Sequence, residues 1–119
     1  MTMLDSERRF QLWEYRVSHG SLLIRSPRAP GFDENVDVTF VGVEYLAAPR
    51  SFNGLQIELG DECDARRVAS TAGRDLESLR VFKLTSNGVC HFVVALSCRV
   101  GRNSNDIFWS PFDSPGVAE

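Results

Sequence analysis

The strongest hydrophobic pattern in the chain is a pair of apolar runs that flank Asn87-Gly88. The runs cover Leu79–Ser86 and Val89–Arg99, and Asn-Gly between two such runs is the strongest short-range indication of a hairpin. The second run is apolar on both alternating faces, which is typical of a strand in the middle of a sheet. We expect a helix to cover one face and curled sheet to cover the other. The two faces hold Cys90, Phe92, Val94, Leu96 and Cys98, and His91, Val93 and Ala95.

A second hairpin is predicted over Gln11–Ser26, where two strand-like runs meet at His19-Gly20. A two-residue loop at that point places Glu14 opposite Arg25, which favours a cross-strand ion pair. The same register gathers five apolar side chains on one face, which we expect to belong to the core. These side chains are Trp13, Tyr15, Val17, Leu22 and Ile24.

Three shorter strand patterns complete the sheet. Residues 36–46 alternate between apolar and polar, but the apolar side changes at Gly42, which indicates a bulge or a bend. Residues 55–59 form a second pattern and residues 106–112 a third. Because Pro111 has no backbone N–H, we expect the last strand to lie at an edge or an end of the sheet.

The period of the pattern changes to that of a helix after Gly60. Asp61, Glu62 and Asp64 supply the negative charge that a helix N-terminus favours, and Gly73 is a suitable C-terminal cap. The apolar residues at helical spacing are Ala65, Val68, Ala69, Ala72, Leu76 and Leu79.

These patterns together predict an α+β fold that is mainly β. We expect six or seven short antiparallel strands curled into a half-barrel or small sandwich, with one helix near residues 61–73. The 119 residues are enough for one core and too few for two. The prediction is therefore a single globular domain over residues 1–119, with flexible ends at about residues 1–8 and 113–119.

Charge and cysteine usage narrow the class of function. A formal net charge of −3 and a pI near 5.4 argue against a general nucleic-acid binder. No apolar run has the length of a signal peptide or a membrane span, so we expect a cytoplasmic protein with no membrane partner. Cys63, Cys90 and Cys98 form no C-x-x-C pair. Free, mostly buried thiols in a reducing compartment are the expected state.

No catalytic, metal-binding or cofactor-binding motif is found. His19 is explained by the hairpin loop, and Cys90 and His91 point to opposite faces of one strand, so they do not share a metal ion. Neither a nucleophile elbow nor a glycine-rich phosphate loop occurs. We therefore expect a protein that is not an enzyme and that carries no cofactor.

The leading hypothesis is a non-enzymatic protein-interaction module, of adaptor or immunity type. Phe108, Trp109 and Phe112 gather near Pro111, with more apolar bulk than a loose chain end usually carries. Covering an open end of the core is the simpler explanation of these aromatics. As an interaction surface, they would contact another protein, or a second copy through an edge strand.

The alternative hypothesis is a small-ligand-binding β domain. A curled sheet can enclose an apolar pocket with a few polar groups. Arg25, Arg28 and Arg50 are placed at strand ends or in loops, where we expect them to contact an anionic ligand.

Overall fold

The computed structural model describes residues 2–76 and 78–113. It contains eight strands, one α-helix and a short 3₁₀ helix, η1. The elements are β1 (Thr2–Arg16), η1 (Val17–His19), β2 (Ser21–Ser26), β3 (Asn35–Val41), β4 (Tyr45–Ala47), β5 (Ser51–Leu59), α1 (Glu62–Ala72), β6 (Arg80–Ser86), β7 (Val89–Ala95) and β8 (Ser97–Asn103).

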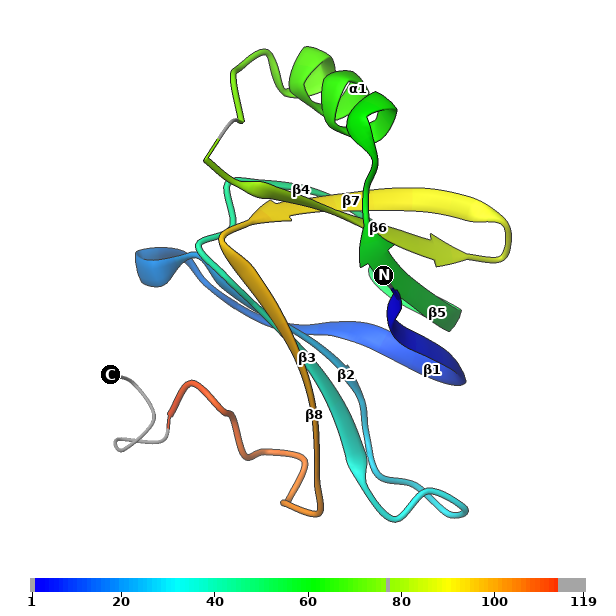
Figure 1. Cartoon of the computed structure of the whole chain (residues 1–119). Coiled ribbons are helices and arrows are strands. Elements are labelled where there is room, and N and C mark those ends of the chain that lie inside the picture. The colour runs from blue at the N-terminus through cyan, green and yellow to red at the C-terminus, as the bar shows by residue number, and fades with distance from the viewer. Residues whose placement is uncertain (1, 77, 114–119) are drawn as a thin grey trace.

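The strands form one antiparallel sheet in the order β4-β7-β6-β5-β1-β2-β3-β8. Only Leu96 separates β7 from β8 in the chain, yet β8 is one edge of the sheet and β7 lies next to the other edge. One residue can join them only because the sheet curls until two layers face each other (Figure 1). The edge strands β4 and β8 do not pair with each other. The predicted mainly β half-barrel is thereby confirmed, with eight strands rather than six or seven.

The core fills the space between the two layers. Phe40 of β3 and Phe82 of β6 meet across it, edge to face, with ring centroids 5.5 Å apart. At the corner between the layers, Gly42 has a φ of 70°, and a Cβ there would lie 2.7 Å from Leu96 Cδ1. Glycine at this position therefore permits the tight bend that the sequence pattern indicates. The buried core side chains are Leu4, Phe10, Leu22, Ile24, Val36, Val38, Phe40, Phe52, Leu55, Ile57, Phe82, Leu84, Val93 and Ala95.

Helix α1 covers the outer face of β6 and β7. It begins with a reciprocal capping box, because Asp61 Oδ1 accepts from the backbone N of Asp64 at 2.8 Å and Asp64 Oδ2 accepts from that of Asp61 at 3.0 Å. The bond from the backbone of Asp64 lowers the pKa of Asp61. Gly73 ends the helix at a φ of 72°. The predicted helix and the Asn87-Gly88 hairpin are confirmed. The predicted strand Val89–Arg99 is covered on both faces only at Val93, Val94 and Ala95, and it breaks at the exposed Leu96 into β7 and β8. Buried contacts join Val68, Leu76, Val81 and Val94.

The hairpin between β1 and β2 has a different register from the predicted one. Gln11 pairs with Arg25, and Glu14 pairs with Leu23. A bulge within β1 shifts the pairing, and η1 (Val17–His19) replaces the two-residue loop. The predicted ion pair between Glu14 and Arg25 is therefore wrong.

The predicted core face of this hairpin is right for β2 only. Leu22 and Ile24 are buried in the core. Tyr15 is 46% exposed and Val17 is 81% exposed. Trp13 contacts Arg25, whose chain neighbour Ile24 points into the core, so the indole lies on the outer face of the sheet.

Both chain ends also differ from the prediction. Residues 2–8 belong to β1 rather than to a flexible end. Residues 106–112 form turns instead of a strand, and the last strand, β8, ends at Asn103. Of the predicted loose end at 113–119, only Asp113 lies within the described residues. Residues 106–112 were mistaken for a strand because they carry large apolar side chains. These side chains do not alternate with polar ones, and the segment lies on the sheet without pairing with any strand.

The cysteines are more exposed than predicted. Cys63 and Cys90 are exposed, and Cys98, which is half-buried, lies on β8 rather than on the same strand as Cys90. All three are free. Within residues 2–76 and 78–113, no helix has both the length and the apolar character needed to cross a membrane.

Candidate functional site

A buried ion pair lies on the outer face of β2 and β3. Arg25 and Asp37 are directly opposite in the ladder, and both point away from the core because Ile24 and Val38 point into it. Arg25 Nε donates to Asp37 Oδ1 at 2.6 Å and Nη2 donates to Oδ2 at 2.9 Å. Asn103 Nδ2 donates to the same Oδ2 at 2.9 Å. This two-point geometry makes the pair a fixed, charge-assisted contact.

The C-terminal segment, which comprises residues 104–113, covers this ion pair. Arg25 Nη1 donates to the carbonyl oxygen of Ile107 at 3.0 Å. The indole rings of Trp13 and Trp109 lie 5.4 Å and 6.0 Å from the guanidinium carbon. Arg25 itself has no exposed surface. Arg25 therefore links the sheet to the segment. It pairs with Asp37 in the sheet, and it contacts the segment through a hydrogen bond to Ile107 and the ring of Trp109.

An asparagine network holds the start of the C-terminal segment. Asn35 Nδ2 donates to Asn103 Oδ1 at 2.9 Å and to the carbonyl of Asn105 at 3.0 Å. Arg28 Nη1 donates to the carbonyl of Ser104 at 2.8 Å. Among the described residues, every buried side-chain nitrogen and oxygen has a partner. The polar outer face is therefore fully satisfied, as a buried network must be to stabilise the fold.

Two side chains from β1 hold the other end of the segment. Ser110 Oγ donates to Glu14 Oε1 at 2.6 Å, and Arg16 Nη1 donates to the carbonyl of Phe112 at 3.2 Å. Arg16 also binds Glu14 and Asp113, and these hydrogen bonds raise the pKa of Arg16. The segment is thus attached to the sheet at both ends and in the middle.

The three aromatics predicted as an interaction surface have different environments. Trp109 and Phe112 are half-buried against the guanidinium groups of Arg25 and Arg16. Phe108 is 88% exposed and Ile107 is 38% exposed. Two of the aromatics therefore pack on the outer face of the sheet rather than over an open end of the core, and the third projects from the segment.

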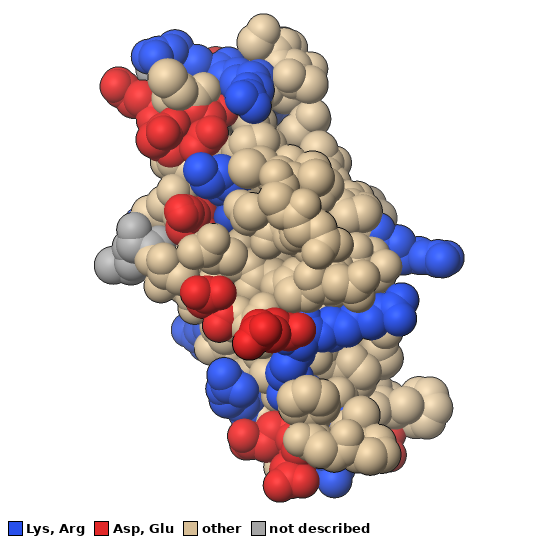
Figure 2. Space-filling view, turned by 90° about the vertical axis from the view of Figure 1, so that its right-hand side faces the viewer, with Lys and Arg blue, Asp and Glu red and all other residues tan. Residues whose placement is uncertain are grey.

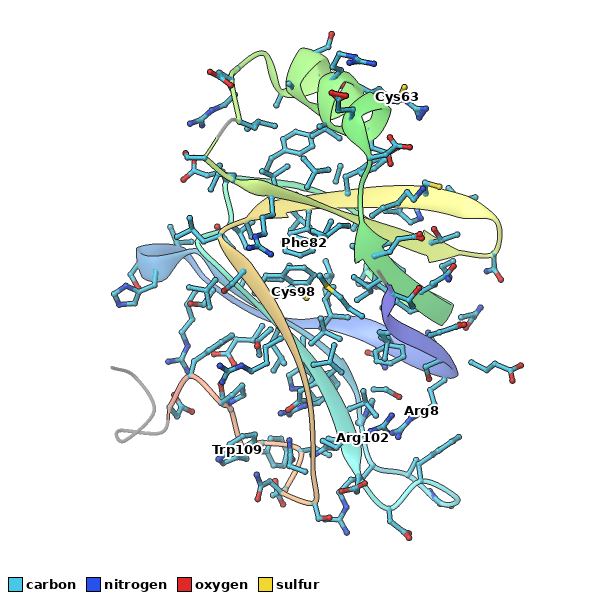
Figure 3. All side chains as sticks on the ribbon, in the orientation of Figure 1. Arg8, Cys63, Phe82, Cys98, Arg102 and Trp109 are labelled. Carbon is cyan, nitrogen blue, oxygen red and sulfur yellow. The ribbon has the colours of Figure 1, made fainter. Side chains whose placement is uncertain are left out.

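A turn fixes the backbone beneath Phe108. Its N–H donates to Asp106 Oδ1 at 2.8 Å, and the N–H of Trp109 donates to the carbonyl of Asp106 at 2.9 Å. The exposed phenyl ring therefore projects from an ordered turn. In Figure 3, the segment and Trp109 lie against the outer side of the lower layer, which comprises β1, β2, β3 and β8.

The three arginines predicted to contact an anion do not form one site. Arg25 is fully buried against Asp37, so it is not accessible to a ligand. Arg28 bonds Ser104, and Arg50 lies in the turn before β5, where its carbonyl accepts from Leu12 at 2.8 Å. On the face that Figure 2 shows, basic side chains lie among acidic ones rather than in a separate patch. The actual roles of Arg16 and Arg25 depend on partners far along the chain, which local patterns do not identify.

Two open hollows lie elsewhere on the surface. One, of about 470 Å³, lies between α1 and β6 and is mostly apolar, with Arg66 and Arg80 among its lining residues. The other, of about 350 Å³, is lined mainly by polar side chains of β1, β5 and the β6–β7 turn. Arg25, Arg28 and Arg50 line neither of these hollows. The two hollows are therefore large enough for a small ligand, but the three arginines that were expected to contact an anionic ligand do not line them.

The thiol of Cys98 and the ring of His91 are both partly buried. Burial raises the pKa of the Cys98 thiol to about 12, so this thiol stays protonated near neutral pH. His91 packs edge to face on Phe52, with ring centroids 6.0 Å apart. Within residues 2–76 and 78–113, no group of three or more His, Cys, Asp or Glu is arranged to hold a metal ion.

The function of the chain has to be inferred from this geometry. Comparison with protein-family models, with curated proteins and with solved structures found no match.

Proposed function

We propose that the protein is a non-enzymatic interaction module that binds another protein through Phe108. The observation that supports the proposal is an 88% exposed phenyl ring on a segment held at both ends and in the middle. Ile107, which is 38% exposed, extends the apolar surface. An adaptor or immunity-type role is consistent with such a surface.

The attachment of the segment matters because binding costs the entropy of ordering the interface. The contacts of Arg16, Arg25 and Asn35 already order the segment in the free protein. Large side chains that enter a partner's pocket supply much of the energy of protein interfaces. Phe108 is suited to that role, whereas Trp109 and Phe112 maintain the shape of the segment.

The proposed partner is a cytoplasmic protein with an apolar pocket. The three free thiols support a reducing compartment, since disulfides form and persist in oxidising ones. Pairing of a second copy along the edge strand β8 is the alternative mode of association.

The test compares Phe108→Ser with Val17→Ser, because Val17 is another highly exposed apolar side chain, at 81%. Each tagged protein is used to capture partners from its source lysate, and binding of the captured protein is then measured with purified components. We expect Val17→Ser to bind like the wild type and Phe108→Ser to lose at least tenfold in affinity, about 1.4 kcal/mol.

Two results would contradict the proposal. Equal binding by Phe108→Ser and wild type excludes this surface. A concentration-dependent dimer in sedimentation, unaffected by Phe108→Ser, assigns association to an edge strand instead. Both variants are expected to unfold at the wild-type denaturant concentration, since neither side chain is buried.

A further inference from the structure

Two arginines occupy the ends of one row of residues across the concave side of the lower layer. Ser26 pairs with Val36, and Val36 pairs with Arg102. Arg8 reaches this row from β1, because its Nε donates to Ser26 Oγ at 2.9 Å. Ser26 and Arg102 follow core-facing residues by two positions, Ile24 in β2 and Val100 in β8, so they point to the concave side.

Arg8 is held rigidly, but by neutral groups. Its Nη2 donates to the carbonyls of Ser26, Pro27 and Glu34, at 3.1, 3.2 and 2.9 Å. Its guanidinium carbon lies 4.4 Å from the centroid of the Phe32 ring. None of these partners is a carboxylate. The charge of Arg8 therefore lacks an ion pair within the described residues, although its direction is fixed.

Arg102 has even fewer partners. It is exposed, and within residues 2–76 and 78–113 its side chain makes no hydrogen bond or ion pair. Arg8 and Arg102 are close enough to affect each other, and Figure 3 shows them next to each other. Burial and then the charge of Arg102 lower the pKa of Arg8, while Glu34 raises it. One nearby carboxylate against two guanidinium groups leaves a net positive charge.

We propose that Arg8 and Arg102 bind one phosphate group between them, either as inorganic phosphate or as a phosphomonoester of a small molecule. Two guanidinium groups match the charge and the several acceptor oxygens of phosphate. Arg8 supplies Nη1, the guanidinium nitrogen that makes no hydrogen bond within the described residues, and Arg102 turns toward the anion when it binds. The site is independent of Phe108, which lies on the outer side of the same layer.

The test uses Arg102→Gln with Arg99→Gln as its matched control. Both arginines are exposed on β8, and both substitutions remove one positive charge, but Arg99 points to the opposite face of the strand. Titration calorimetry with inorganic phosphate is run at constant ionic strength, so that screening does not change. We expect millimolar or tighter binding to the wild type, a loss of at least tenfold in Arg102→Gln and no loss in Arg99→Gln.

Two further measurements distinguish free phosphate from a phosphomonoester, and the effect of charge at position 102 from the effect of guanidinium geometry. Tighter binding of glycerol phosphate than of inorganic phosphate assigns the site to a phosphomonoester, and the reverse order assigns it to the free ion. Arg102→Lys keeps the charge and is expected to bind with an intermediate affinity, since a lysine does not form the paired contacts of a guanidinium. Absence of phosphate binding by the wild type, or equal losses in Arg102→Gln and Arg99→Gln, would overturn the proposal.

Discussion

The half-barrel covers its two outer faces by opposite means. Over β6 and β7, α1 packs apolar side chains around the fully buried Val94. Over β1, β2 and β3, a segment without regular structure lies on the buried Arg25–Asp37 pair and on hydrogen bonds from side chains to its backbone. The apolar cover, which is α1 over β6 and β7, is stabilised by burial of apolar area. The polar cover, which is residues 104–113 over Arg25 and Asp37, is stabilised by complete pairing of polar groups.

The difference determines how each cover fails. Loss of a methyl group under α1 removes packing in proportion to its size. Loss of one partner in the polar cover leaves a charge buried without compensation, which costs more than the pair itself stabilises. Both tryptophans of the chain, Trp13 and Trp109, flank Arg25, so intrinsic fluorescence reports specifically on the polar cover.

The largest effect is expected from Asp37→Ala, which leaves the fully buried Arg25 without its carboxylate. The free energy of unfolding should fall by about 3–5 kcal/mol in urea denaturation, with a red shift of tryptophan emission. Arg25→Met combined with Asp37→Leu removes both charges and should cost clearly less. Equal losses in the single and double variants would show that the charges are not the cause.

The apolar cover should respond to Leu76→Ala with a smaller loss. Leu76 is 8% exposed and packs with Val68 and Val94. We expect a decrease of about 2–3 kcal/mol in the free energy of unfolding. Native tryptophan emission should stay unchanged, because α1 does not contact the polar cover. A red shift in this variant would mean that the two covers are coupled.

Cys98 lies on the concave side of the sheet, away from both covers, and it makes the stability of the fold depend on pH. Its pKa in the fold, about 12, exceeds the ordinary value of 9.0, so above pH 9 the unfolded chain releases the proton and the folded chain keeps it. Wild type should therefore lose stability relative to Cys98→Ala as pH rises from 9 toward 12, by about 1 kcal/mol per pH unit, and show no such trend below pH 9. Denaturation of both proteins across this range is the measurement, and parallel curves would contradict it.

The smallest effect is expected from Ser110→Ala at one end of the polar cover. The hydroxyl donates to Glu14 and accepts from the backbone N–H of Phe112. Its loss should cost about 1 kcal/mol and increase amide exchange in the C-terminal segment, with exchange in α1 unaltered. Unchanged exchange in the segment would show that Arg16 and Arg25 suffice to hold it.

Sequence patterns predicted the apolar cover and missed the polar one. The helix follows from spacing, from the Asp61 cap and from Gly73, all of which act within a few residues. The role of Arg25 depends on Asp37, which is 12 residues away, and on Ile107, which is 82 residues away. A single bulge in β1 was enough to misplace its predicted partner, because a register shift changes every cross-strand contact.

The candidate site was predicted only in outline. The sequence predicted the aromatic cluster near Pro111 as a candidate surface, and Phe108 is the exposed member of that cluster. The sequence did not distinguish Phe108 from Trp109, since the two are neighbours of similar character. Their separation depends on the Asp106 turn and on the position of Arg25 below it.

The sequence by itself determined part of the local structure: the helix with its acidic start and its end at Gly73, the Asn87-Gly88 turn and the mainly β class. Neighbouring residues are sufficient for these features, because capping, turn geometry and side-chain alternation are short-range. Only the tertiary structure decided that Arg25 is buried, that Ser110 meets Glu14 across 96 residues and that Arg8 and Arg102 converge. These contacts depend on the curl of the whole sheet, which sums the bulges and twists of eight strands and is not encoded at any one position.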